Sequence, residues 1–182
     1  MDRVIIFSIS ATLIIAISWR TIFDTGSHGL YRTLSWLCIA WLFASNYREW
    51  FSRPFSLQQI FSWIFLIISA YMVITGVNLL KKKGVPTKQR NENALYQFEQ
   101  TSTLVDTGIF KYIRHPMYSS LVFLTWGIYL KNPTFPLFII ALLSTLFLYL
   151  TAVFEEKECL HYFGEKYLEY MTRSKRFIPY LF

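Results

Sequence analysis

Two short polar stretches combine residue types that could bind a charged small molecule. The first, RHPMYSS, begins at Arg114 and stands where a polar segment gives way to an apolar run. Proline is well tolerated in the first turn of a helix, because the N–H that it lacks would have no partner there. A helix is therefore predicted to begin at His115 or Pro116, and the spacing then places His115, Tyr118 and Ser119 on one face of its first turn.

The start of this helix could hold an anion. Backbone N–H groups are free in a first turn, and the helix dipole adds partial positive charge, which suits a carboxylate or a phosphate. Arg114 would add a full positive charge. The alternative is structural: Arg114 reaches to the membrane surface, His115 caps the helix and Tyr118 belongs to an aromatic belt, which is a common arrangement at membrane interfaces.

The second stretch, TAVFEEKECLHYFGEKYLEYMTRSKRFIPYLF, begins at Thr151 and contains a pair of adjacent glutamates. Continued as a helix, it places Thr151, Glu155 and Glu158 on one face and turns Glu156 aside. Such carboxylates could fix an ammonium group or a ribose-bearing ligand, and the alternative is a solvated helix end in which Lys157 offsets one glutamate. Together with the anion site, they would fit a zwitterion, for which an amino-acid-like ligand is the natural candidate.

The elements that position these stretches are predicted to be membrane helices. Of the 182 residues, 54% are hydrophobic, 19% aromatic and 16% charged, which is too apolar for an ordinary soluble domain. Between the charges lie five uncharged runs: Val4–Trp19, Thr33–Tyr47, Pro54–Leu80, His115–Leu130 and Asn132–Phe154. The sequence thus predicts an all-α polytopic membrane protein, a single domain over 1–182, with three spans in 1–80, a cytoplasmic connecting loop in 81–114, and two spans with a tail in 115–182.

Length supports the third and fifth runs best, since a helix needs roughly 20 apolar residues to cross a bilayer. The first, second and fourth runs hold 16, 15 and 16 residues, so they span only if flanking arginines and lysines snorkel or the bilayer thins. The alternative for the first two is a hairpin of buried or interfacial helices. With five spans, 14 basic residues fall on one side and four on the other. Because positive residues favour the cytoplasm, the N-terminus is expected outside, and the loop and tail in the cytoplasm.

Several function classes lose support. No Asp, Glu, Lys or Arg falls within the five runs, whereas ion pumps and voltage sensors need ionisable groups at membrane depth. The three histidines lack metal-ligand spacing, so no metal is expected. The net charge of +7 is mostly a membrane-surface feature, for which anchoring of the Lys81 to Lys83 run on anionic headgroups is sufficient, and a nucleic-acid role has little support.

The ordered motifs resemble a known family. TLVDTGIFKYIRHPMYSS, followed about one span later by EEKECLHYFGEKYLEYMTRSKRFIP, is similar to the C-terminal half of integral membrane methyltransferases. The similarity is closest to the isoprenylcysteine carboxyl methyltransferase family and is shared more loosely with phospholipid N-methyltransferases. It covers roughly residues 102 to 179. The set of a TGxF turn, RHPxY, an EE pair, FGxxYxxY and RFxP is far more specific than any one part.

The resemblance implies S-adenosylmethionine as methyl donor, bound in a cytoplasm-facing pocket between the last two spans, the preceding loop and the tail. By position, the cofactor-binding residues expected are Ser102, Thr103, Leu104, Val105, Phe110, His115, Pro116, Met117, Tyr118, Glu155 and Glu156. The residues expected to be catalytic are Arg114, His115 and Tyr118. Those expected near the methyl acceptor are Thr151 and Arg173, and Tyr167 is a further candidate for closing the site. Aromatic faces such as Tyr118 or Phe110 could stabilise a sulfonium by cation–π contact.

Two positions depart from the family. The eukaryotic prenylcysteine enzymes have an arginine where this chain has Thr151, and a histidine where it has Ser102. The predicted function is therefore an S-adenosylmethionine-dependent methyltransferase acting on a lipophilic or membrane-associated acceptor, such as a lipid or a prenylated molecule that enters laterally from the bilayer. The alternatives are a phospholipid N-methyltransferase, a small-thiol S-methyltransferase, or a non-catalytic membrane assembly or sensing subunit.

Overall fold

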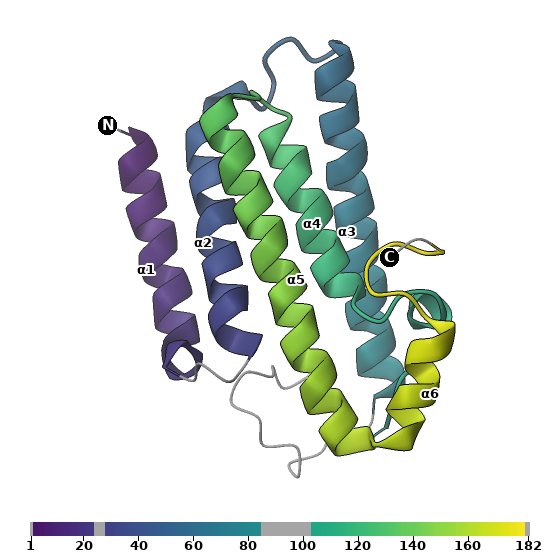
Figure 1. The fold of residues 1–182 in the computed structure, drawn as a ribbon. Coiled ribbons are helices and arrows are strands. Elements are labelled where there is room, and N and C mark those ends of the chain that lie inside the picture. Colours follow the sequence, from purple (N-terminus) through teal and green to yellow (C-terminus); the bar gives the residue numbers. More distant parts are fainter. Residues whose placement is uncertain (1, 24–27, 85–102, 181–182) are drawn as a thin grey trace.

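The computed structural model describes residues 2–23, 28–84 and 103–180, and its regular elements in these ranges are helices. Five of them lie side by side in an elongated bundle, and a sixth folds back at one end (Figure 1). In chain order the elements are α1 (Asp2–Ile22), α2 (His28–Asn46), the 3-10 turn η1 (Tyr47–Glu49), α3 (Leu57–Lys83), the 3-10 turn η2 (Gly108–Lys111), α4 (Pro116–Tyr129), α5 (Phe135–Phe163) and α6 (Glu165–Arg173).

Successive helices of the bundle run in alternating directions (Figure 1). Helix α2 packs against α1 and α5, and α4 packs against α3 and α5. The connections α2–α3 and α4–α5 meet at one end, where buried Lys131 donates to the carbonyl oxygens of Trp50 (3.4 Å) and of the Gln59 side chain (3.1 Å). The RHP segment and α6 lie at the opposite end, so the fold gathers the predicted site residues there.

Three helices, α1, α3 and α5, are long and apolar enough to cross a membrane. Helix α2 has 19 residues and α4 has 14, and neither meets the same criterion. At 1.5 Å per residue α4 is about 21 Å long, against roughly 30 Å for a hydrocarbon core. The chain is thus an all-helical membrane protein, and the count of five spans with the N-terminus outside stays a prediction.

Small and hydroxyl-bearing residues join the helices inside the bundle. Ser144 on α5 bonds Ser35 on α2 at 2.9 Å and Thr125 on α4 at 3.1 Å. Such pairs hold helices together where apolar surface gives no preference over lipid. Gly127 lets α4 approach α3 closely, because a Cβ at this position would lie 2.9 Å from the Leu66 side chain.

Two sequence features set the geometry of the site end. Helix α4 begins at Pro116, with His115 as the preceding N-cap residue, which confirms the predicted helix start. Helix α5 ends at Phe163 and is followed by Gly164, whose φ of +59° would be strained for a residue with a side chain. This glycine turns the chain so that α6 folds back and places its aromatic residues over the start of α4.

Candidate functional site

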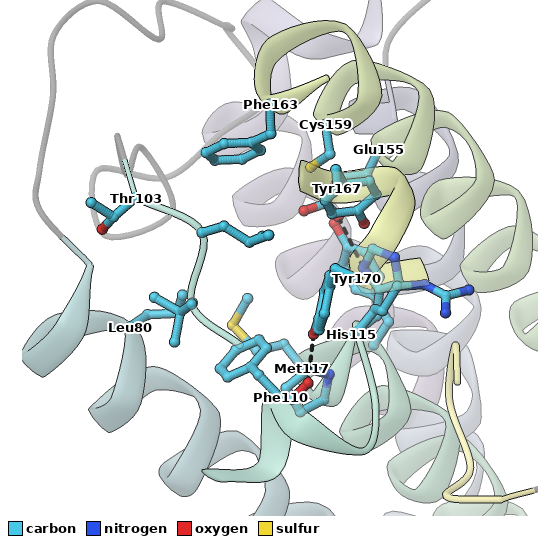
Figure 2. A pocket seen from close by; sticks show the side chains of 15 residues that line it. Leu80, Thr103, Phe110, His115, Met117, Glu155, Cys159, Phe163, Tyr167 and Tyr170 are labelled. Atoms are coloured by element: carbon cyan, nitrogen blue, oxygen red, sulfur yellow. Dashed lines mark hydrogen bonds and ion pairs between the residues drawn. The ribbon is translucent and has the colours of Figure 1, made fainter. Parts of the chain in front are cut away.

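A cavity lies at the end of the bundle where α3 ends and α4 begins (Figure 2). Its walls come from four parts of the chain: the end of α3, the segment leading into α4, the second half of α5, and α6. The residues that line it are Leu80, Thr103, Leu104, Val105, Phe110, Arg114, His115, Pro116, Met117, Tyr118, Glu155, Cys159, Phe163, Tyr167 and Tyr170. Most of the residues predicted from the motifs therefore lie around one space.

His115 lies between two carboxylates. His115 occupies the N-cap position of α4, as the structural alternative expected, but its side chain makes no capping hydrogen bond. Its Nδ1 lies 3.6 Å from Glu155 Oε2, and its Nε2 lies 3.4 Å from Glu156 Oε1. The imidazole stacks on Tyr118, with ring centroids 5.4 Å apart and planes inclined by 16°. This contact confirms that His115 and Tyr118 share a face of the first helical turn.

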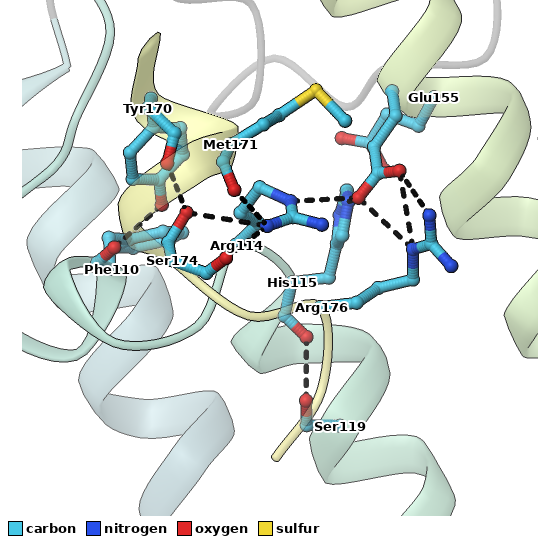
Figure 3. Close-up of polar contacts among 10 residues, drawn as sticks. Phe110, Arg114, His115, Ser119, Glu155, Tyr170, Met171, Ser174 and Arg176 are labelled. Carbon is cyan, nitrogen blue, oxygen red and sulfur yellow. Dashed lines mark hydrogen bonds and ion pairs between the residues drawn. The ribbon is translucent and has the colours of Figure 1, made fainter. Parts of the chain in front are cut away.

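Glu156 is buried and binds Arg114 and Arg176, the two arginines labelled in Figure 3. Arg114 Nε donates to Glu156 Oε1 at 2.8 Å. Arg176 donates from Nη2 to Glu156 Oε2 at 2.6 Å and from Nε to Glu156 Oε1 at 3.1 Å. A solvated helix end offset by Lys157 was the alternative for the glutamate pair, and it is wrong for Glu156, which is 4% exposed. Glu156 lies behind the cavity wall, where it joins the RHP segment to the C-terminal tail.

The backbone makes the same connection. Arg114 N donates to Lys175 O at 2.8 Å, Lys175 N donates to Tyr112 O at 2.9 Å, and His115 N donates to Arg176 O at 3.2 Å. These bonds form a short parallel bridge between the segment before α4 and the tail. The guanidinium of Arg114 also donates to the carbonyl of Ser174. The donors of Arg114 thus hold the tail in place around the site.

Glu155 faces the cavity and is less completely paired. Its side chain is 16% exposed, yet its Oε2 atom is buried and accepts no hydrogen bond from the described residues. Its nearest charged partner, His115 Nδ1, lies 3.6 Å away, so this oxygen has room for a further hydrogen-bond donor. Of the two adjacent glutamates, Glu156 is structural and Glu155 is available to a ligand.

Aromatic side chains complete the walls. Tyr170, on α6, donates from its hydroxyl to Phe110 O at 2.6 Å, and the rings of Tyr167 and Tyr170 lie 5.7 Å apart. Burial raises the pKa of both phenols above their ordinary range, so both are neutral. Such a neutral, electron-rich wall suits a ligand that carries a positive charge next to apolar groups.

The sequence interpretation missed some of the lining and included residues that lie apart from it. Leu80, Cys159, Phe163 and Tyr170 line the cavity and were not predicted, although the FGxxYxxY spacing could have indicated the two aromatic residues. Thr151 is fully buried and donates within α5 to Phe147 O, and Arg173 pairs at 2.6 Å with Asp106 on the surface. Neither lines the cavity, and Ser102 lies outside the described residues.

The charge of His115 makes the stability of the site depend on pH. Burial lowers the pKa of His115, but the two neighbouring carboxylates outweigh this effect and raise the pKa above its ordinary value of 6.5. The imidazolium thus contributes stability that is fully present below the unfolded pKa and is lost as pH rises through the higher folded pKa.

We therefore expect the thermal unfolding midpoint of the detergent-solubilised protein to fall from about pH 6 to about pH 9, and to fall less in His115→Gln. His161→Gln is the control, because His161 is an exposed residue outside the cavity lining. An equal pH dependence in His115→Gln and the unsubstituted protein would contradict the assignment of charge to His115.

The fold and the site define an all-helical membrane protein with a polar ligand site at one end of its bundle. Residues 57–166 match the family model described as phospholipid methyltransferase. This match covers more than half of the chain, and the chain belongs to that family. Together with the relatives that follow, this match confirms the predicted similarity to isoprenylcysteine and phospholipid methyltransferases.

Curated relatives are named protein-S-isoprenylcysteine O-methyltransferase. The chain is similar to that of Homo sapiens, with 30% identity over 139 residues, which covers 70% of this chain and 48% of the relative. Against that of Tribolium castaneum the identity is 26% over 151 residues, covering 71% and 53%. The chain therefore spans about half the length of the curated relatives it matches. No solved structure matches it.

Proposed function

We propose that this protein is an S-adenosylmethionine-dependent methyltransferase that acts on a lipophilic acceptor at the membrane surface. The observation that carries the proposal is Glu155, a carboxylate that faces the cavity with one buried oxygen lacking a hydrogen bond among the described residues. S-adenosylmethionine offers an ammonium group and ribose hydroxyls, either of which would donate to that oxygen. The names of the relatives and the family match support a methyl transfer.

The remaining walls fit the other parts of the cofactor. His115 and the free N–H groups at the start of α4 would hold its carboxylate. Phe110 and Tyr118 would face the sulfonium, with each aromatic contact worth on the order of 1 kcal/mol. The cavity has a volume of ≈ 80 Å³ and is not closed off from solvent, so S-adenosylmethionine would also extend out of it. Bound S-adenosylmethionine supplies an activated methyl group, and the chain positions the acceptor against it.

A second, apolar cavity supports a lipophilic acceptor. It has a volume of ≈ 540 Å³ and lies between α4 and α5, lined by residues that include Ser119, Val122, Tyr149 and Phe177. The Phe177 ring lies 6.4 Å from that of His115, so the apolar cavity adjoins the polar one. An acceptor chain lying in the apolar cavity would place its head group beside the polar site.

The chemistry favours an acidic head group. A carboxylate or thiolate needs no general base before methylation, whereas an ammonium must first lose a proton. His115 is held as an imidazolium by its two glutamates and is a poor base. Arg176, whose guanidinium lies 5.0 Å from the Tyr149 ring, brings positive charge to the edge of the apolar cavity. We therefore propose a prenylcysteine-like carboxylate as acceptor, with a phospholipid amine as the second candidate because of the family description.

The basic residues near this end of the bundle support a cytoplasmic orientation. Lys81, Lys82 and Lys83 form the last turn of α3, and Lys111 and Lys175 lie on the segments that frame the cavity. Positive residues of this kind are enriched on the cytoplasmic side of membrane proteins. The proposed site therefore takes its cofactor from the cytoplasm and its acceptor from the bilayer.

Two measurements test the proposal. Calorimetry on the purified protein in detergent is expected to detect S-adenosylmethionine binding. A labelled-methyl assay is then expected to show transfer to a prenylcysteine analogue in preference to phosphatidylethanolamine or a small thiol. Val122→Trp, which fills the apolar cavity, is expected to reduce transfer to the prenylcysteine analogue at least tenfold while S-adenosylmethionine binding stays unchanged.

The outcomes separate the candidates. Absence of S-adenosylmethionine binding by the intact protein would reject the enzyme and favour a non-catalytic membrane subunit. Binding with preferential transfer to the phospholipid or the thiol would retain the methyltransferase and reject the prenylcysteine-like acceptor. Undiminished transfer by Val122→Trp would reject the apolar cavity as the acceptor site.

A further inference from the structure

A second buried histidine lies near the site, on a helix outside the matched region. His28 is the first residue of α2 and is fully buried. Its Nδ1 lies 2.5 Å from Glu158 Oε2, and its backbone N–H donates to Glu158 Oε1 at 3.3 Å. One carboxylate on α5 thus contacts both the side chain of His28 and the start of its helix. The family match begins at residue 57, so it does not include this contact.

The partner of His28 stands one helical turn from the ligand-facing carboxylate. Glu158 follows Glu155 by three residues on α5, and residues three apart on a helix are neighbours. Two like charges at this spacing repel each other, and the repulsion is stronger where both are partly shielded from water. The side chains of Glu155 and Glu158 are only 16% and 20% exposed.

His28 supplies the charge that balances this pair. The charged groups around it are Glu155 and Glu158 on α5 and buried Arg32 on its own helix. Burial lowers the pKa of His28. The hydrogen bond to Glu158 and the charges of both glutamates raise it by more, so that the net shift of the pKa is upward. The His28 imidazolium binds Glu158, and Glu155 is the carboxylate that faces the cavity.

We propose that His28 is a positioning residue for the cofactor site, which binds Glu158 so that Glu155 alone presents a negative charge to the ligand. The inference rests on the proposed function, because it assigns to Glu155 the cationic or ribose end of S-adenosylmethionine. Through this contact, α2 becomes part of the site although none of its residues lines the cavity.

A double-mutant cycle separates electrostatic positioning from a merely structural contact. S-adenosylmethionine binding is measured by calorimetry for the full chain in detergent, for His28→Ala, Glu158→Gln and the double variant. His28→Ala leaves a second, unbalanced negative charge beside Glu155, which attracts the cationic ligand, and is expected to tighten binding about tenfold. Glu158→Gln is expected to change affinity by less than about twofold, because the amide oxygen still accepts the imidazole hydrogen bond.

The decisive variant is the double one. If His28 acts by balancing charge, His28→Ala combined with Glu158→Gln returns the affinity to nearly that of the unsubstituted protein, since the extra carboxylate charge is gone. If the contact were merely structural, His28→Ala would weaken binding and the double variant would bind no better, because the hydrogen bond is missing in both. His161→Ala serves as the matched control, since His161 is an exposed histidine three residues beyond Glu158 on the same helix.

Each result has a defined meaning. Tighter binding by His28→Ala that returns to normal in the double variant supports the proposal; unchanged or weaker binding by His28→Ala, or no return in the double variant, overturns it. His28→Gln repeats the cycle if His28→Ala does not give a cooperative thermal transition. Failure of the unsubstituted protein to bind S-adenosylmethionine would reject the proposed function itself, which is a different result from normal binding that His28→Ala does not change.

Discussion

Glu155→Gln is expected to weaken S-adenosylmethionine binding about 100-fold, equivalent to about 2.8 kcal/mol. The substitution keeps the size of the side chain and removes the charge that would meet an ammonium or two ribose hydroxyls. Hydrogen bonds to a charged group are worth more than neutral ones, and the loss is larger where water cannot replace the partner. Calorimetry in detergent at a fixed pH measures the change.

The same variant is expected to lower the thermal unfolding midpoint of the ligand-free protein only slightly. His115 loses the charge of Glu155, 3.6 Å away, but it keeps that of Glu156 at 3.4 Å. Glu165→Gln is the control, because Glu165 is an exposed glutamate at the start of α6. Affinity within threefold of the unsubstituted protein, or a large fall in the unfolding midpoint, would contradict a ligand-binding role for Glu155.

Local sequence rules predicted the parts of the site that depend on neighbouring residues. A proline at a helix start fixes where α4 begins, and helical spacing then fixes that His115 and Tyr118 share a face. The composition and the uncharged runs predicted an all-helical membrane protein. Counting spans was less certain, because α2 and α4 are short and their ability to cross depends on the surrounding bilayer and helices.

Contacts between distant segments could not be predicted in this way. Helical spacing showed that Glu155 and Glu156 point in different directions, but it could not show which of them would meet arginines. The answer depends on the C-terminal tail. Arg176 follows Glu156 by 20 residues and lies back against α5, where it binds the Glu156 carboxylate. The contact of His28 with Glu158 joins residues 130 positions apart, and no short sequence motif indicates it.

The two adjacent glutamates therefore have different roles. Glu156 has satisfied partners and joins three segments, namely α5, the RHP segment and the tail. Glu155 is under-satisfied and faces open space. Sites that bind ligands are often less stable than the surrounding structure, since groups poised for a ligand lack partners in its absence. Comparing isosteric substitutions at the two positions tests this division directly.

Glu156→Gln is expected to destabilise the protein by about 3 to 5 kcal/mol, because removal of one partner from a buried ion pair leaves the opposite charges uncompensated. Arg114 is 8% exposed at its side chain and loses its carboxylate, as does Arg176, while His115 keeps Glu155 but loses its second carboxylate. The amide can accept a hydrogen bond but carries no charge to offset the two guanidinium groups. We expect the thermal unfolding midpoint in detergent to fall on the order of 10 °C.

Asp106→Asn is the matched control, since it also removes a carboxylate from an arginine pair. The pair of Asp106 with Arg173 is exposed, with side chains 34% and 53% accessible, and surface pairs contribute about 0 to 1 kcal/mol. The midpoint of Asp106→Asn is therefore expected to stay close to that of the unsubstituted protein. If Glu156→Gln unfolds no earlier than Asp106→Asn, Glu156 does not anchor the tail, and the distinction between the two glutamates fails. If Glu156→Gln unfolds early while Glu155→Gln does not, burial and pairing assign structure to one carboxylate and ligand binding to its neighbour.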